Sequence, residues 1–122
     1  HDQNTVRALA PMIVSPELRD RQEVALALGE IGGPEAYLLL LGAIQDQDSG
    51  VRWRACQSLG QLGDRRAMFS LQRLLTEEHD PKVRKHAEQA IERLASLRVD
   101  LRGSYAQEIA PEEEVSNEGA LK

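Results

Sequence analysis

The chain has 122 residues, of which 41% are hydrophobic and 29% charged, and its formal net charge is −5. This length suits a single globular domain with a buried core, and the hydrophobic content excludes a chain that is disordered throughout. Because only 3% of residues are aromatic and there is one cysteine, the core must consist of aliphatic side chains. The single cysteine also excludes an internal disulfide and a cysteine cluster for zinc or an iron–sulfur centre.

Hydrophobic residues that recur at helical spacing predict six helices, arranged as three consecutive pairs. The first helix of each pair has an apolar face at positions i, i+3 and i+7, and this face recurs at an offset of 31 residues. Those faces consist of Val6, Leu9 and Ile13, then Tyr37, Leu40 and Ile44, then Met68, Leu71 and Leu75. The predicted helices cover residues 4–14, 18–31, 34–45, 50–62, 65–76 and 81–101. Pro11 lies inside the first of them and should kink it.

The second helices of the pairs carry an internal sequence repeat. Residues 24–32 return as 55–63 at an offset of 31 residues, and 83–91 follow 51–59 at an offset of 32. A period of this length is typical of a solenoid, in which each helical pair packs only on its neighbours. We therefore predict an all-α fold, an α-solenoid (α-α superhelix) of about three helical hairpins, which occupies residues 1–102.

The turns between the predicted helices agree with this reading. Gly32 and Gly63 follow the second helices, where a flexible residue ends a helix. An acidic residue opens each second helix and an arginine follows four residues later, in the pairs Glu17 with Arg21, Asp48 with Arg52 and Asp80 with Arg84. We interpret these pairs as a structural ladder, in which the acid caps free N–H groups and the arginine reaches back to it or to the next repeat.

The segment at 48–64, DSGVRWRACQSLGQLGD, and the DPKVR at 80–84 that repeats its start resemble the short HEAT-like repeat first recognised in phycobilisome lyases. The resemblance covers about residues 5–97, and it implies the solenoid fold. It implies no single function, because the same repeat serves as scaffold, adaptor, chromophore-lyase subunit, hydroxylase and nucleic-acid binder.

No set of residues in the sequence suggests catalysis or metal binding. His1, His79 and His86 do not share a helical face with a carboxylate at ligand spacing, so we expect no metal and no cofactor. The di-iron hydroxylases built on similar repeats carry His-Glu pairs where this chain has Trp53-Arg54 and Lys85-His86. Cys56 is expected to be a small buried hydrophobe rather than a nucleophile. We therefore predict that the protein is not an enzyme.

The helix at 50–62 provides the best candidate for a binding surface. Val51, Ala55 and Leu59 form its inward face, and Trp53 lies about 200° from Val51, so it should point outward. Since the second helices of HEAT-like stacks line the concave side, the resemblance implies a partner-binding strip there. We predict that this strip consists of Gln22, Glu23, Leu26, Trp53, Arg54, Gln57, Lys85, His86 and Gln89. The alternative for Trp53 is a ring that lies flat on the adjacent repeat.

Residues 103–122 form an acidic tail. After residue 99 the sequence has six acidic and two basic residues, which leaves the repeat body with a net charge of −1. A segment this polar has little apolar surface to bury, so we expect it to be disordered. The alternative is that Tyr105 and Ile109 cover the exposed apolar edge of the last repeat.

Three functions fit these observations. Our leading hypothesis is a non-catalytic scaffold or adaptor module that binds a protein partner and belongs to a longer repeat array. The alternative is a phycobilin lyase or lyase-like subunit, which would bind a chromophore and its acceptor protein. Third comes a nucleic-acid-binding solenoid, which the nearly neutral repeat body disfavours. No apolar run approaches the roughly twenty residues that span a bilayer, and the start of the chain has no signal-peptide pattern, so we expect a cytoplasmic protein without membrane insertion.

Overall fold

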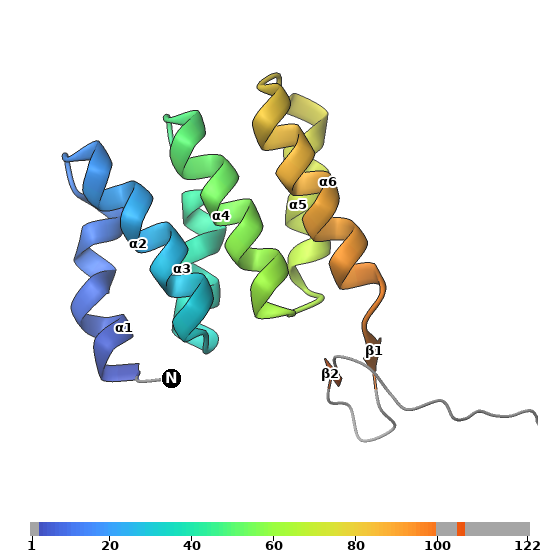
Figure 1. Ribbon diagram of the computed structural model, residues 1–122, viewed down its shortest axis with the longest axis horizontal. Helices are drawn as coiled ribbons and strands as arrows, with labels where there is room; N and C mark the ends of the chain where they lie inside the picture. The colour runs from blue at the N-terminus through green and yellow to red at the C-terminus, as the bar shows by residue number, and fades with distance from the viewer. Residues whose placement is uncertain (1–2, 100–104, 107–122) are drawn as a thin grey trace, which may run out of the picture.

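The computed structural model describes residues 3–99 and 105–106, with side chains described for residues 3–97. Figure 1 shows three helical hairpins side by side, with α2, α4 and α6 in one layer and α1, α3 and α5 in the other. Apart from two short strands, the described chain is therefore the predicted all-α solenoid. Its elements are α1 (Gln3–Leu9), the 3₁₀-helix η1 (Ala10–Val14), α2 (Leu18–Ile31), α3 (Pro34–Ala43), α4 (Ser49–Leu62), α5 (Ala67–Glu77), α6 (Pro81–Ala95), β1 (Arg98–Val99) and β2 (Tyr105–Ala106).

The helix predicted over 4–14 is divided into two parts. Its α-helical part ends at Leu9, and the 3₁₀-helix η1 continues the same direction with Pro11 as its second residue. Proline has no N–H to donate to a carbonyl one turn back, but Pro11 lies in the first turn of η1, where an N–H needs no partner within the helix. The disturbance expected at Pro11 thus takes the form of a change in helix type.

The helix predicted over 81–101 extends too far, because α6 ends at Ala95 and the described residues 96–99 are not helical. The prediction extended the helix along apolar residues at helical spacing, but Leu97 is buried in the turn after the helix rather than within it. Beyond this turn, β1 pairs antiparallel with β2, with Arg98 opposite Ala106 and Val99 opposite Tyr105. The strand pairing satisfies backbone groups that the longer helix would have satisfied internally.

This pairing also bears on the predicted tail. Tyr105 and Ala106, which lie within the predicted tail, form the strand β2. The expected disorder of residues 103–122 stays a prediction. Ile109 and the acidic residues after it lie outside the described residues. The boundary that we predicted at residue 102, and the capping of the last repeat by Tyr105 and Ile109, stay predictions.

Aliphatic side chains form the core, as the composition requires. The largest fully buried side chains include Leu28, Leu40, Leu59, Leu71 and Leu94, which come from both layers and from all three hairpins. The apolar side chains of each helix pack between the two layers, so the remaining side chains of that helix lie on the surface.

Small residues allow the helices of the second layer to approach closely. A Cβ atom built on Gly29 of α2 would lie 2.8 Å from the Cα atom of Ser58 in α4. One repeat later, a Cβ atom on Gly60 of α4 would lie 3.1 Å from Cα of Ala90 in α6. The hydroxyl of Ser58 donates a hydrogen bond of 2.6 Å to the carbonyl oxygen of Ala25. The same close contact therefore recurs at both interfaces of this layer, and it holds the surface residues of α4 and α6 in a fixed register.

Candidate partner-binding surface

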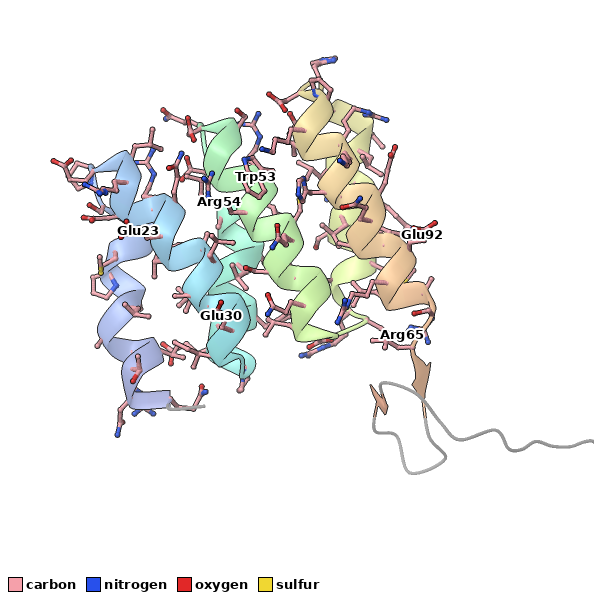
Figure 2. The ribbon with its side chains drawn as sticks, in the orientation of Figure 1. Glu23, Glu30, Trp53, Arg54, Arg65 and Glu92 are labelled. Carbon is pink, nitrogen blue, oxygen red and sulfur yellow. The ribbon has the colours of Figure 1, made fainter. Side chains whose placement is uncertain are left out.

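The nine residues predicted to bind a partner all lie on the layer of α2, α4 and α6. Figure 2 shows Trp53 and Arg54 on α4, in the same layer as Glu23 of α2. Glu23, Gln57, Lys85 and Gln89 are exposed, and the other five residues of the strip are partly buried. No residue of the predicted strip is fully buried, so each can present atoms to a partner.

The indole of Trp53 packs against the next repeat. Its ring centroid lies 4.6 Å from that of His86 on α6, with an angle of 35° between the two planes. The Arg54 guanidinium lies 4.3 Å from the centroid, and the Lys82 ammonium lies 4.4 Å from it. Cations over an aromatic face are attracted by its quadrupole. The ring is partly buried and also contacts the core, which agrees with the alternative that it lies on the adjacent repeat. We call Trp53, Arg54, Lys82 and His86 the Trp53 cluster.

Hydrogen bonds orient two members of the Trp53 cluster. Nη1 of Arg54 donates to the Gly50 carbonyl at 2.8 Å. Nδ1 of His86 lies 3.0 Å from the carbonyl oxygen of Lys82, so this nitrogen carries the proton in the contact. The other ring nitrogen, Nε2, is then the acceptor of the neutral imidazole. Within the described part of the chain, neither Arg54 nor Lys82 forms an ion pair.

The predicted strip does not include Lys82, because the phase of one helix does not show which side chains of the next helix lie against it. Lys82 lies in the first turn of α6, and its partner Trp53 comes from the second turn of α4. The offset of 32 residues places Lys82 in the register of Gly50, so the repeat gives no hint of a contact with the aromatic ring. Only the spacing and tilt of the two helices bring these side chains together.

A groove of about 560 Å³ runs between α4 and α6, and we call it the α4–α6 groove. Gly60 and Ala90, which mark the closest approach of the two helices, contribute no side chain beyond Cβ. His86 lines the groove and also stacks on Trp53, so the Trp53 cluster adjoins the groove. The lining residues are Gln57, Gly60, Gln61, His86, Gln89, Ala90, Glu92 and Arg93.

The structure divides the predicted strip into two parts. Gln57, His86 and Gln89 line the α4–α6 groove, with Trp53 and Arg54 beside it, whereas Lys85 and the three residues of α2 do not line it. Gln22 instead donates to the Asp48 carboxylate at 3.4 Å across the α2–α4 interface. The candidate surface is therefore centred on the second and third hairpins.

A second hollow of about 580 Å³ lies at the other side of the same two repeats, beside the loops that open α4 and α6. Phe69 on α5 borders it and is 69% exposed, and Arg73 lies one turn further along α5. Phe69 was not among the predicted site residues, although the repeat marks this surface. Leu38 on α3 precedes Phe69 by the repeat offset of 31 residues, and it is also exposed.

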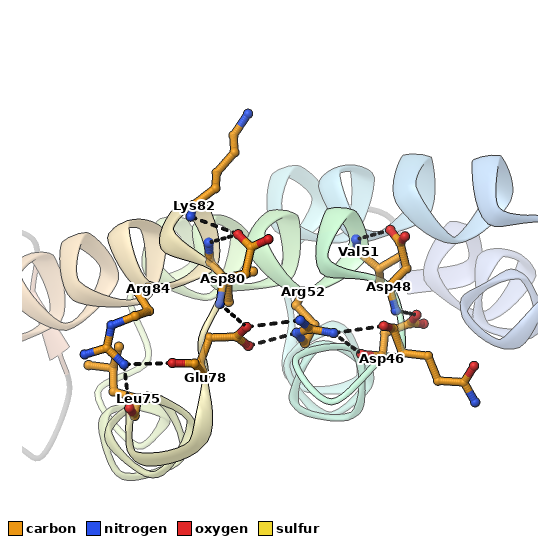
Figure 3. A network of polar contacts seen from close by, with 11 residues as sticks. Asp46, Asp48, Val51, Arg52, Leu75, Glu78, Asp80, Lys82 and Arg84 are labelled. Carbon is orange, nitrogen blue, oxygen red and sulfur yellow. Dashed lines mark hydrogen bonds and ion pairs between the residues drawn. The ribbon is translucent and has the colours of Figure 1, made fainter.

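Arg52 and Asp80 of the predicted ladder line this hollow, and Figure 3 shows the polar contacts around them. Arg52 donates two hydrogen bonds to Glu78 of the next repeat, and Arg21 pairs with Asp46 in the same way, at 3.0 Å. Arg21 and Arg52 thus reach the next repeat and not the acid four residues before them. The third ladder arginine, Arg84, donates to the carbonyl oxygens of Leu75 and Glu78 in its own repeat. Asp48 accepts a hydrogen bond from the amide of Val51 as the helix cap.

Two of the three predicted ladder acids cap their helices. Asp80, like Asp48, accepts hydrogen bonds from backbone amides of its own helix, in this case those of Lys82 and Val83. The backbone hydrogen bond from Val83 keeps the pKa of Asp80 below its ordinary value. Glu17 was expected in the same role, but its side chain makes no capping hydrogen bond. The hydroxyl of Ser15 accepts from the Glu17 amide instead, which leaves the longer glutamate side chain in solvent.

Cys56 lies in the core of these repeats. Burial raises the pKa of the Cys56 thiol to about 12, so at neutral pH this residue is a protonated, inert side chain. In the part of the chain that the structure describes, no group of three or more His, Cys, Asp or Glu side chains could hold a metal ion. Among the described residues there is also no helix long and apolar enough to cross a membrane.

Comparisons with known proteins agree with this architecture. The family described as HEAT repeats matches residues 4–92. The chain is also similar to the Bilin biosynthesis protein PecE of Mastigocladus laminosus, with 36% identity over 80 residues. That alignment covers 65% of this chain and 28% of the relative, so the chain spans little more than a quarter of the length of that protein.

Proposed function

This chain belongs to the HEAT-repeat family, and we propose that it is a non-catalytic module that binds a protein partner on the face formed by α2, α4 and α6. The observation that supports this most is the α4–α6 groove, which adjoins a tryptophan flanked by two cations. Tryptophan and arginine are the residues most enriched at the energetic centres of protein interfaces. A protein partner therefore has both a concave site and residues suited to hold it.

The relative's length favours a place for this module in a longer repeat array. Since the chain spans 28% of that protein, a partner can contact other parts of the array as well. In a solenoid each repeat contributes a strip of the same surface, so affinity accumulates along the array. The strip proposed here would supply the part of that surface formed by α4 and α6.

The test is affinity capture from the native source with three versions of the chain. A groove variant, Gln57→Glu with Gln89→Glu, places two carboxylates on exposed positions of the groove. A matched variant, Leu38→Glu with Phe69→Glu, places two carboxylates on exposed positions of the other layer. We expect the wild type and the matched variant to retain the same partner, and the groove variant to lose it. Loss by the matched variant alone would contradict the proposed surface.

A second candidate function is a role in bilin binding, because the similar protein is named as a bilin biosynthesis protein. Both hollows have the volume of a small-molecule site. The one beside Phe69 combines an exposed aromatic ring with a cation, Arg73, which suits a flat apolar molecule that carries carboxylates. Titration with a bilin, followed by its absorbance, tests this candidate. An absorbance change that Phe69→Ala removes would support it, and an unchanged spectrum would contradict it.

A further inference from the structure

We propose that the α4–α6 groove binds a short, extended segment of a partner protein whose acidic side chain lies against the Trp53 cluster. This inference rests on the proposed function and specifies the chemistry of the partner. It follows from the shape of the groove, from the hydrogen-bonding groups that line it and from the charge at one end.

The groove presents amide groups along a floor without large side chains. Gln57, Gln61 and Gln89 line it, and all three are exposed. A carboxamide has two N–H donors and a carbonyl acceptor, so it can complement both the N–H and the C=O of a peptide unit. Because Gly60 and Ala90 form the floor, a main chain can approach the helices closely. These features favour recognition of backbone over recognition of a large side chain.

The length of the groove sets the length of the bound segment. From His86 to Arg93 the helix α6 advances by about 10 Å, at about 1.5 Å per residue. An extended chain advances by about 3.3 Å per residue, so about three residues cover the same distance. A fourth or fifth residue would then reach the Trp53 cluster.

The charge at the His86 end selects an acidic residue. Arg54 and Lys82 both lie against the indole, and neither forms an ion pair within the described part of the chain. Asp48 and Asp80, the capping residues of α4 and α6, already accept hydrogen bonds from backbone amides of their own helices. Two cations held beside a partly buried ring favour a carboxylate over a neutral side chain.

The opposite end of the groove carries one charge of each sign, on Glu92 and Arg93, so it adds no preference for an anionic or a cationic ligand. Two further carboxylates, Glu23 and Glu30, are exposed on α2 in the same layer, as Figure 2 shows. A long polyanion such as a nucleic acid would be repelled along this surface, whereas a short segment with one or two acids would meet only the cationic end. The observations therefore favour a peptide over a nucleic acid.

Trp53 is the sole tryptophan of the chain, so its fluorescence reports binding at the proposed site directly. The probes are two hexapeptides of glycine, alanine and two adjacent glutamates, the second peptide with glutamine in place of both glutamates. We expect the acidic peptide to change the fluorescence saturably and to bind about tenfold more tightly than the amide peptide. Lys82→Gln should remove most of this difference. Arg73→Gln, which deletes an exposed cation on the other layer, should leave it unchanged.

Several results would overturn the inference. It fails if the two peptides titrate alike, or if Lys82→Gln behaves as Arg73→Gln does. It also fails if a single-stranded oligonucleotide displaces the acidic peptide at lower concentration than the peptide itself binds, because the site would then recognise polyanions. If replacing Glu112, Glu113 and Glu114 with glutamine tightens peptide binding about tenfold, the occupant is the chain's own acidic segment. Failure with the peptides, combined with capture of a partner that the groove variant loses, would contradict this inference but not the proposed function.

Discussion

The guanidinium of Arg52 in α4 and the carboxylate of Glu78 in the next repeat form a two-point contact, with Nε to Oε1 at 2.8 Å and Nη2 to Oε2 at 3.0 Å. The same arginine donates to the carbonyl oxygens of Asp46 and Gln47, which lie in the loop between α3 and α4 of its own repeat. Glu78 is 7% exposed and also accepts from the backbone amide of Asp80. One arginine therefore connects two consecutive loops, and it fixes the spacing of the repeats that form both hollows.

Glu78→Gln should destabilise the protein by about 3 kcal/mol, because it leaves Arg52 largely buried without its counter-charge. The measurement is the urea midpoint of unfolding at pH 7, followed by circular dichroism. Glu77→Gln is the matched control, since Glu77 is the exposed neighbour of Glu78, and its midpoint should equal that of the wild type. Equal midpoints for both variants would show that the contact adds little to stability.

The pH dependence of stability should report the same contact. Burial raises the pKa of Glu78, but the hydrogen bonds from Arg52 and from the Asp80 amide outweigh it, so this pKa lies below its ordinary value of 4.5. The unfolded chain then takes up the proton first as the pH falls. Stability from Glu78 is therefore present above about pH 4.5 and is lost as the pH falls through the lower, folded value.

Urea midpoints measured at pH 7 and pH 3.5 test this sign. The wild type should lose more stability between the two values than Glu78→Gln, which has no carboxyl group to protonate at this position. Asp64 and Asp80, whose pKa values are also lowered, keep part of the acid dependence in both proteins. An equal loss in the two proteins would contradict the assignment to Glu78.

The sequence predicted the fold well because the same helical spacing of hydrophobic residues occurs in all three repeats. Helix α2 begins and ends at the predicted residues, 18 and 31, where Gly32 with a φ of 79° ends it. Where the repeat ends, the prediction failed, and α6 stops at Ala95 because strand pairing and the buried Leu97 replace the helical continuation. Periodicity predicts helices reliably only where every copy of the repeat supports it.

The candidate site could be predicted only in part. The helical phase of α4 predicted that Trp53 lies outside the inward face of its helix, and the ring is partly buried and contacts the core. It could not predict that Lys82 lies over the ring, that α2 contributes nothing to the groove, or that Arg52 pairs with Glu78 rather than Asp48. Each of these depends on the distance and tilt between helices, which a single-helix pattern does not contain.

Trp53→Ala should lower stability by about 1–2 kcal/mol, because the partly buried ring contacts both the core and the next repeat. Thermal melting measures this. If the surface proposed above is correct, the same variant should lose at least about 2 kcal/mol of affinity for a captured partner. Full affinity at temperatures where the variant is folded would leave Trp53 with a packing role alone.

Cys56 should be almost unreactive in the folded protein. Its side chain is 0% exposed, and burial raises the thiol pKa from 9.0 to about 12. A pKa that is higher by three units lowers the thiolate fraction about 1000-fold at pH 8. Burial also blocks the reagent from the sulfur atom, which slows the reaction further. A disulfide reagent followed by absorbance should therefore react slowly with native protein and fully in 6 M urea, about the concentration that unfolds small domains. Comparable rates in the two conditions would mean that α4 opens readily.

Two glycines in the same kind of secondary structure should respond in opposite ways to alanine. A Cβ atom on Gly29 would lie 2.8 Å from Cα of Ser58, a backbone atom that cannot move without separating α2 from α4. Gly29→Ala should therefore cost about 1–3 kcal/mol even though alanine favours helix.

Gly42 lies in α3, and nothing lies within 4 Å of a Cβ atom built there. Gly42→Ala should then stabilise the protein by about 0.5–1 kcal/mol, through helix propensity alone. Thermal melting should show a lower midpoint for Gly29→Ala and a higher one for Gly42→Ala. A higher midpoint for both would mean that α2 and α4 can move apart at no cost, and that the close contact at Gly29 does not set their register.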